Sequence, residues 1–169
     1  MKAGTALRVV RHVATDHGSV RRKFPKAALD RIEAAIRAGE SRHRGQLRFA
    51  VEPALPIARV LRGVSPRERA LEVFGLLRVW DTADNCGVLV YLLLADRGVE
   101  IVADRAIHGH VGSAAWAAVC RRMERAFGDG RFAEGVEAGI AEIGAMLAEH
   151  FPRAPGAGTN ELPDRPVVL

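Results

Sequence analysis

Hydrophobic and polar positions along the chain repeat with two periods, one typical of strands and one typical of helices. Residues 46–51 alternate between apolar and polar side chains, which predicts a half-buried strand. Residues 87–94 are almost wholly apolar, as in a central strand that is buried on both faces. Residues 99–104 alternate again, and the tight turn at 95–98 predicts that the last two strands form an antiparallel hairpin.

Apolar residues at helical spacing separate these strands. The predicted helices cover residues 3–14, 25–42, 65–78, 113–127 and 132–151. The third begins with Ser65-Pro66-Arg67-Glu68, a capping box with proline at the first helical position. Asp16–Ser19 is interpreted as a break and residues 104–110 as a loop, whereas Ser113 is expected to cap a helix. The order predicts an α/β fold, a three-layer α/β sandwich. Its small mixed sheet, a parallel crossover plus an antiparallel hairpin, is flanked by helices on both faces.

The positive charge of the chain is concentrated at its N-terminal end. The formal net charge is +5, but residues 1–26 hold seven Lys and Arg against one Asp, so the remaining residues sum to −1. This division predicts a basic N-terminal arm over 1–24, a domain over 25–152, and a Pro/Gly-rich linker and tail over 153–169. Because a nucleic-acid-binding domain usually spreads its basic face over the fold, the distribution argues against nucleic acid as the partner.

Composition indicates a folded domain that does not cross a membrane. Hydrophobic residues make up 49% and charged residues 27% of the chain, a globular balance. No run reaches the roughly 18 apolar residues of a membrane helix, and the N-terminus lacks the apolar stretch of a secretory signal. A cytoplasmic location is therefore expected. Cys86 and Cys120 lie in apolar surroundings and are expected to be reduced core thiols.

Hairpin geometry predicts one place where a site could form. Since strands 87–94 and 99–104 run antiparallel, the loops 81–85 and 104–110 lie at the same end of the sheet. If strand 46–51 is parallel to strand 87–94, the segment before it ends there too. The candidate site residues gathered at this edge are Glu40, His43, Trp80, Asp81, Asp84, Asn85, Asp104, Arg105, His108 and His110.

The chemistry of these residues leaves alternatives open. Carboxylates with asparagine and backbone carbonyls suit calcium or magnesium, and adding His108 or His110 would suit a transition metal. Asp and Asn are also common turn residues that bond their own backbone, a loop histidine is often solvated, and Trp80 also fits a core or rim aromatic. The motifs of nucleotide-binding loops, serine hydrolases, zinc peptidases and dithiol redox proteins are absent, so no catalytic residue is predicted.

Several sequence segments resemble one known family. The run Asp84-Asn85-Cys86-Gly87-Val88-Leu89 is followed by Asp96-Arg97-Gly98-Val99-Glu100-Ile101, and Phe127-x-x-Gly130-x-Phe132-x-x-Gly135 comes later. These segments resemble the D/N-N-G-V-L strand, the D-x-R-x-x-I strand and the closing segment of the TPM-domain family. Residues 45–48 are similar to its first strand, and residues 70–74 to its crossover helix.

The resemblance implies a three-layer α/β sandwich and kinship with a thylakoid-lumen protein of photosystem II repair. Some relatives are described as calcium-binding, plant members have a proposed acid phosphatase activity, and bacterial relatives often accompany LemA-type membrane proteins. Carried over to this chain, the candidate metal ligands are Asp84, Asn85 and Asp104. Cys86 stands where relatives often have a second asparagine, which removes one oxygen ligand, and this chain lacks the membrane helix of many relatives.

Three functional hypotheses compete. The first is a non-catalytic adaptor. Its arm, residues 1–26, docks on the anionic inner face of the membrane or on an acidic partner. The domain edge or the tail then binds a second protein. The alternative is a weak metal-dependent acid phosphatase, in which the carboxylates hold calcium or magnesium and Arg105 stabilises charge. A third hypothesis, nucleic-acid binding through the arm, depends on phosphate contacts alone.

Overall fold

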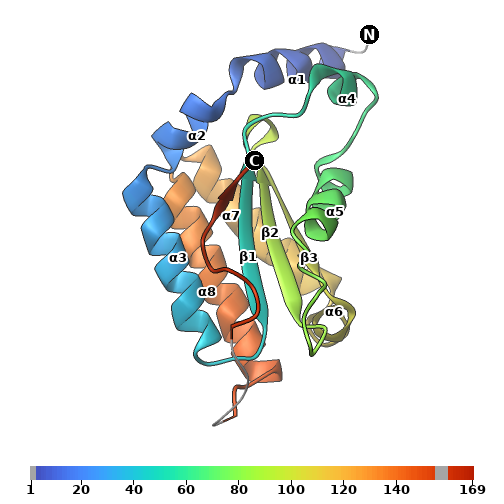
Figure 1. Ribbon diagram of the computed structural model, residues 1–169. Coiled ribbons are helices and arrows are strands. Elements are labelled where there is room, and N and C mark those ends of the chain that lie inside the picture. The colour runs from blue at the N-terminus through green and yellow to red at the C-terminus, as the bar shows by residue number, and fades with distance from the viewer. Residues whose placement is uncertain (1–2, 155–159) are drawn as a thin grey trace.

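The computed structural model describes residues 3–154 and 160–169, which form a mixed sheet between two layers of helices (Figure 1). The strands are β1 (Gln46–Glu52), β2 (Gly87–Leu93), β3 (Gly98–Ala103) and β4 (Val167–Val168). The helices are α1 (Ala3–Ala14), α2 (His17–Lys23), α3 (Lys26–Glu40), α4 (Ile57–Leu61), α5 (Pro66–Leu76), α6 (Arg105–Val111), α7 (Ser113–Gly128) and α8 (Phe132–His150), with one 3-10 turn, η1 (Leu94–Asp96).

The sheet has the strand order β3-β2-β1-β4. β1 is parallel to both β2 and β4, and β2 is antiparallel to β3. The predicted parallel crossover, the hairpin and the three-layer α/β sandwich are therefore confirmed. The fourth strand was not predicted, because two apolar residues at the end of a polar tail have no period of their own.

The larger core lies between the sheet and the helices α3, α7 and α8. Leu47, Phe49 and Val51 of β1 face this layer and are buried, since successive strand residues point to opposite faces. Phe127 and Phe132, from the two helices α7 and α8, stack with ring centroids 5.0 Å apart. This layer contains most of the apolar positions that the helical spacing predicts.

A second core lies on the opposite face, under α5. The predicted capping box is present, because Ser65 Oγ accepts from Glu68 N at 3.1 Å and Glu68 accepts from Ser65 N at 2.7 Å. Tyr91 of β2 is buried among these residues, and its hydroxyl donates to Glu52 at 2.6 Å. The short helix α4, which precedes α5, was not predicted.

Two aspartates begin helices where breaks or loops were predicted. Asp16 accepts from Ser19 N at 2.8 Å and caps α2, and Asp104 accepts from Arg105 N at 2.7 Å at the start of α6. The prediction was wrong because the same short side chain serves turns and N-caps. Ser113 was expected to cap α7, but Gly112, with φ of 80°, precedes the helix and Ser113 is its first residue.

The helix α1 packs with its polar face toward the domain, over η1 and α4. Arg8 donates to both carboxylate oxygens of Asp96, at 3.2 Å to Oδ1 and at 2.8 Å to Oδ2, and to the carbonyl of Val64 at 2.8 Å. His12 is buried, and its Nδ1 accepts from Leu55 N at 2.9 Å, so its Nε2 carries the proton that faces Asp96 Oδ1 at 3.2 Å. The apolar stripe of α1 is consequently turned outward.

Candidate functional site

Several predicted site residues line one cavity at the end of the sheet where β2 begins. Its volume is about 390 Å³. The β2–β3 pairing explains this, since Val88 lies opposite Ala103 and Asp104 N donates to Gly87 O at 2.9 Å. The loop before β2 and the start of α6 therefore lie side by side, as the hairpin geometry predicts for these segments. The lining residues are Trp80, Asn85, Asp104, Arg105 and Ala106.

Gly87 allows the loop before β2 to approach the strand closely. A Cβ at this position would lie 1.8 Å from the carbonyl oxygen of Val79. The chain turns twice through the left-handed region around this contact, at Arg78 with φ of 51° and at Asn85 with φ of 49°. Trp80 is left 52% exposed at the cavity, as a rim aromatic rather than a core residue.

The cavity contains two of the three predicted metal ligands. Asp84 faces Arg44 instead, with Oδ2 3.0 Å from the guanidinium. Asp104 uses one oxygen to cap α6, which leaves its other oxygen and the amide oxygen of Asn85 as candidate ligands for a hard cation. Arg105 in the same lining adds positive charge, which opposes a cation. In the parts of the chain that the structure describes, no group of three or more His, Cys, Asp or Glu could hold a metal ion.

The two loop histidines and Asp81 lie away from this cavity. His108 lines another cavity, of about 340 Å³, together with Trp116 and Cys120. The ring of His110 stands edge-on to Phe151, with centroids 5.3 Å apart. Asp81 is exposed in its loop. The fold therefore keeps His108 and His110 apart from the carboxylate of Asp104 in the first cavity, and they do not form the predicted transition-metal site together.

Glu40 and His43 lie at the same end of the sheet but are buried. Glu40 Oε1 accepts from Leu47 N at 2.7 Å, and burial, reinforced by the nearby carboxylate of Asp164, raises the pKa of Glu40 to about 7. His43 Nδ1 donates to Gly45 O at 3.0 Å, and burial lowers the pKa of His43 to about 4. These residues join β1 to α3 and the C-terminal segment rather than facing solvent.

Both cysteines are free thiols. Cys86 is buried, and its Sγ donates to Arg44 O at 3.2 Å. Burial raises the pKa of the Cys86 thiol, and it raises the pKa of Cys120 to about 11. Neither thiol is therefore activated as a nucleophile.

Two polar clusters were missed by sequence reasoning. One is the contact of Arg8 and His12 with Asp96, and the other surrounds Arg48 under the C-terminal segment. The only sequence indication of the first cluster was that His12 lies on the same face of helix 3–14 as the arginines. The second had one indication, the arginine and glutamine within an otherwise apolar strand.

The fold and the cavity define a small α/β sandwich domain with polar loops at one end of its sheet. The model of the TPM domain matches residues 23–146, and the chain belongs to the TPM-domain family. It is similar to the BA42 protein from the psychrophilic bacterium Bizionia argentinensis, whose NMR structure gives a TM-score of 0.72 at 27% identity over 88% of this chain and 94% of that one. None of the curated proteins matches.

The match to the family model ends before both termini of the chain. It begins at the last residue of α2 and stops within α8, so α1 and the segment 160–169 lie outside it. The described residues contain no helix long and apolar enough to cross a membrane.

Proposed function

We propose that this chain is a non-catalytic interaction domain that attaches peripherally to anionic membranes through α1 and α2. One observation carries the proposal: Leu7, Val10 and Val13 on the outer face of α1 are 60%, 62% and 69% exposed. A surface helix normally buries its apolar stripe against the core. Here Arg8 and His12 occupy the buried side, which leaves the apolar stripe for an external partner.

Charge around this stripe favours a lipid surface as the partner. Arg11, Arg21 and Arg22 are exposed on α1 and α2, so cations accompany the apolar residues. This combination is typical of helices that lie in the membrane interface. Each such cation contributes about 1 kcal/mol near an anionic leaflet, and each inserted apolar side chain adds on the order of 1 to 2 kcal/mol.

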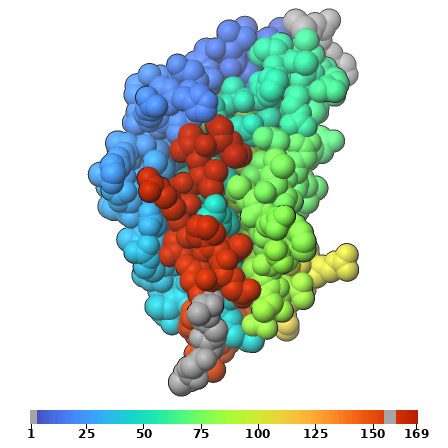
Figure 2. Space-filling view, viewed as in Figure 1, coloured from blue at the N-terminus to red at the C-terminus, as the bar shows by residue number. Residues whose placement is uncertain are grey.

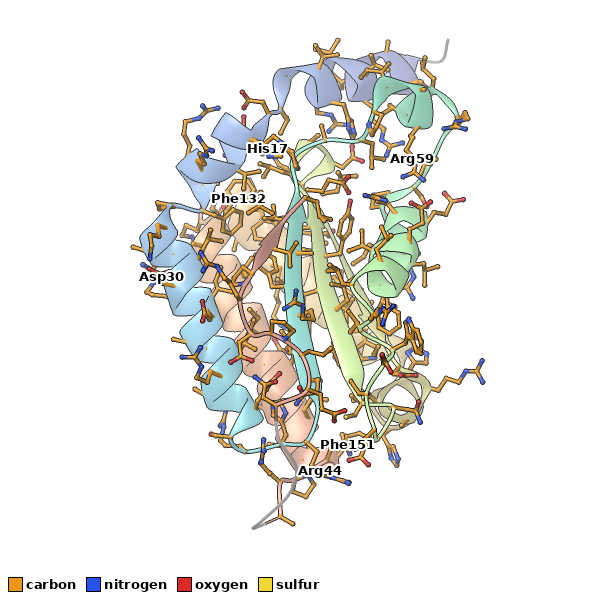
Figure 3. All side chains as sticks on the ribbon, in the orientation of Figure 1. His17, Asp30, Arg44, Arg59, Phe132 and Phe151 are labelled. Atoms are coloured by element: carbon orange, nitrogen blue, oxygen red, sulfur yellow. The ribbon has the colours of Figure 1, made fainter. Side chains whose placement is uncertain are left out.

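The proposed membrane face lies at one end of the molecule, and the loop cavity lies at the other. Figure 3 shows His17 of α2 and Arg59 of α4 near the end formed by α1, whereas Arg44 and Phe151 lie at the opposite end. The seven residues of β2 separate the two ends by about 20 Å. A membrane-bound domain would then direct its cavity away from the lipid. A LemA-type membrane protein, the partner that the resemblance implies, would contact the chain at its membrane face.

Vesicle flotation tests the proposal. We expect the wild-type chain to float with phosphatidylcholine vesicles that contain phosphatidylserine, and to float less as salt is added. The triple variant Leu7→Ser/Val10→Ser/Val13→Ser should stay at the bottom of the gradient. The matched control is Leu71→Ser/Leu76→Ser on α5, which changes two residues that are also at least 50% exposed and should float like the wild type.

Two outcomes would contradict membrane attachment. One is equal flotation of the wild type and the triple variant. The other is that neither protein floats, and light scattering shows a dimer for the wild type and a monomer for the triple variant. In that case a second copy of the chain, rather than lipid, would cover the apolar stripe.

The cavity supports a second candidate, binding of calcium or magnesium through Asp104 and Asn85. Two protein oxygens and several waters form a weak site, so tight binding is not part of the proposal. The acid phosphatase alternative needs a firmly held cation that activates water, or a side-chain nucleophile. The described lining residues of this cavity offer only a weak cation site and include no Ser, Thr, Cys or His. The cavity therefore supports binding better than catalysis.

A further inference from the structure

The C-terminal segment 160–169 crosses the face of the sheet between α3 and α5 (Figure 1), and it covers the surface of the molecule there (Figure 2). Leu162, Asp164 and Pro166 are buried, whereas the residues between them are exposed. This alternation is that of an extended peptide lying on a surface. The segment ends as β4, where Val167 pairs with Ala50.

Side chains on the outer face of β1 hold the backbone of this segment. Gln46 Oε1 accepts from the amides of Glu161 at 2.7 Å and Leu162 at 2.9 Å. Arg48 donates to the carbonyl of Pro163. Backbone contacts of this kind, together with β4 pairing, are how proteins bind extended peptides along a strand.

Asp164 provides the charged side-chain contact of this segment. Its carboxylate is buried and accepts from Arg37 Nε at 3.1 Å and from Asn160 at 2.6 Å. Arg48 lies nearby, and Asp164 and Glu40 both act electrostatically on its guanidinium. An aspartate between two arginines is recognised by charge and hydrogen bonds that a neutral residue cannot supply.

The surface of β1 and α3 that the segment covers, here called the groove, is unusually polar for the inside of a domain. Glu40, Gln46, Arg48 and Asp164 are all at least nine-tenths buried there. Glu40 Oε2 and Arg48 Nε are buried without a hydrogen-bond partner among the described residues. An unsatisfied buried polar atom costs about 1 to 3 kcal/mol. The chain's own tail therefore fills the groove without satisfying every group in it.

We propose that this groove is a recognition site for an extended peptide of the pattern Leu-x-Asp-x-Pro on a partner protein, with the chain's own tail as its resident occupant. The tail competes from an effective concentration on the order of millimolar, so a partner must displace it. Displacement also affects the cavity loop, because Glu161 Oε2 accepts from Ala83 N at 2.9 Å. The site is independent of the membrane face, which lies on other residues.

Fluorescence anisotropy with a labelled peptide of residues 160–169 tests this proposal on the full chain. The variant Leu162→Ser/Asp164→Ala weakens the resident tail. We expect it to bind the peptide at least about tenfold more tightly than the wild type does, because its groove is more often free. A peptide carrying alanine at the position of Asp164 should bind at least about tenfold more weakly. A folded variant that binds neither peptide, or both equally, would overturn the proposal.

Hydrogen exchange on the wild type provides a readout that does not depend on any variant. The amides of Glu161, Leu162 and Leu169 are hydrogen-bonded to β1. A displaceable tail opens without global unfolding, so these amides should exchange at least about tenfold faster than those of β2. Equal exchange would mean that the tail is an integral part of the fold. If the wild type forms a dimer in which each copy places its tail in the groove of the other, the occupant is a second copy rather than a partner protein. This result would also overturn the proposal.

Discussion

The guanidinium of Arg8 lies 2.8 Å from the carboxylate of Asp96, and this contact joins α1 to the turn of the β2–β3 hairpin. Both side chains are largely buried, and His12 approaches the same carboxylate from within α1. Asp96, together with the backbone of Leu55 and Val64, therefore holds the polar side of α1 against the domain. The proposed membrane surface depends on this arrangement.

The variant Asp96→Ala should lower the free energy of unfolding by about 2 kcal/mol, because it leaves two buried donors, Arg8 and His12, without their acceptor. Urea unfolding measures the change. The matched control is Asp129→Ala, whose partner Arg131 is exposed and whose loss should cost less than about 0.5 kcal/mol. Equal changes in the two variants would mean that α1 is not held by Asp96.

Substitution of Gly87 should disrupt the loop that forms the cavity. In Gly87→Ala the new Cβ would meet the backbone oxygen of Val79 at 1.8 Å, and backbone cannot rotate away as a side chain can. We expect a loss of about 3 kcal/mol or more of stability, measured by urea unfolding. Gly109→Ala is the control, since nothing lies within 4 Å of its Cβ and alanine favours the helix. A Gly87 variant as stable as the wild type would contradict the loop packing.

The buried pair Glu40 and His43 should affect stability with opposite dependence on pH. Folded Glu40 keeps a proton that the unfolded chain loses between pH 4.5 and about 7, so its contribution to stability falls as pH rises. Unfolded His43 takes up a proton below pH 6.5 that the folded chain accepts only near pH 4, so its contribution falls as pH falls. The two effects oppose each other where the windows overlap.

The variant Glu40→Gln removes the first effect and keeps the hydrogen bond from Leu47 N. Relative to the wild type, it should gain about 3 kcal/mol of stability between pH 4.5 and pH 7. Urea unfolding of both proteins at the two pH values measures the difference. If that difference does not change with pH, Glu40 is already ionised in the folded chain.

Cation binding at the cavity should depend on Asp104 and not on Asp84. Calorimetry with calcium, magnesium and zinc is expected to show heat with the wild type that Asp104→Ala abolishes. Asp84→Ala should retain most of it, since Asp84 is paired with Arg44. Trp80, half-exposed at the same cavity, provides a fluorescence readout. The absence of heat with every ion would refute the cation site, and phosphatase activity that survives Asp104→Ala would refute a catalytic role for this residue.

The main elements of the fold were predictable because each depends on local sequence. The alternation over residues 46–51 and the apolar run over 87–94 identify β1 and β2, and the capping box at Ser65 marks the start of α5. The helices α2 and α6 were missed, because an aspartate that caps a helix and one that stabilises a turn are identical in sequence. The hairpin geometry correctly placed Asn85 beside Asp104 and the start of α6, although residues 105–111 form a helix rather than the predicted loop.

The detail of the candidate site could not be read from residue types. Asp84 and Asp104 are equivalent in a sequence, yet Arg44 pairs with the first and the cavity includes only the second. Glu40 and His43 were expected at the same edge of the sheet, and they are buried there against residues more than 100 positions away, Pro152 for His43 and Arg153 for Glu40. Burial depends on long-range contacts, which no local pattern encodes.

The sequence by itself determined the periods of the strands and helices, the concentration of positive charge at the N-terminal end, and the resemblance to the TPM-domain family. Only the tertiary structure decided that α1 turns its apolar stripe outward and that the tail fills a polar groove on β1. The physical reason is the same in both cases. Buried charged groups must find partners. Asp96 for Arg8, and the exposed Arg37 for the buried Asp164, come from segments far away in the chain.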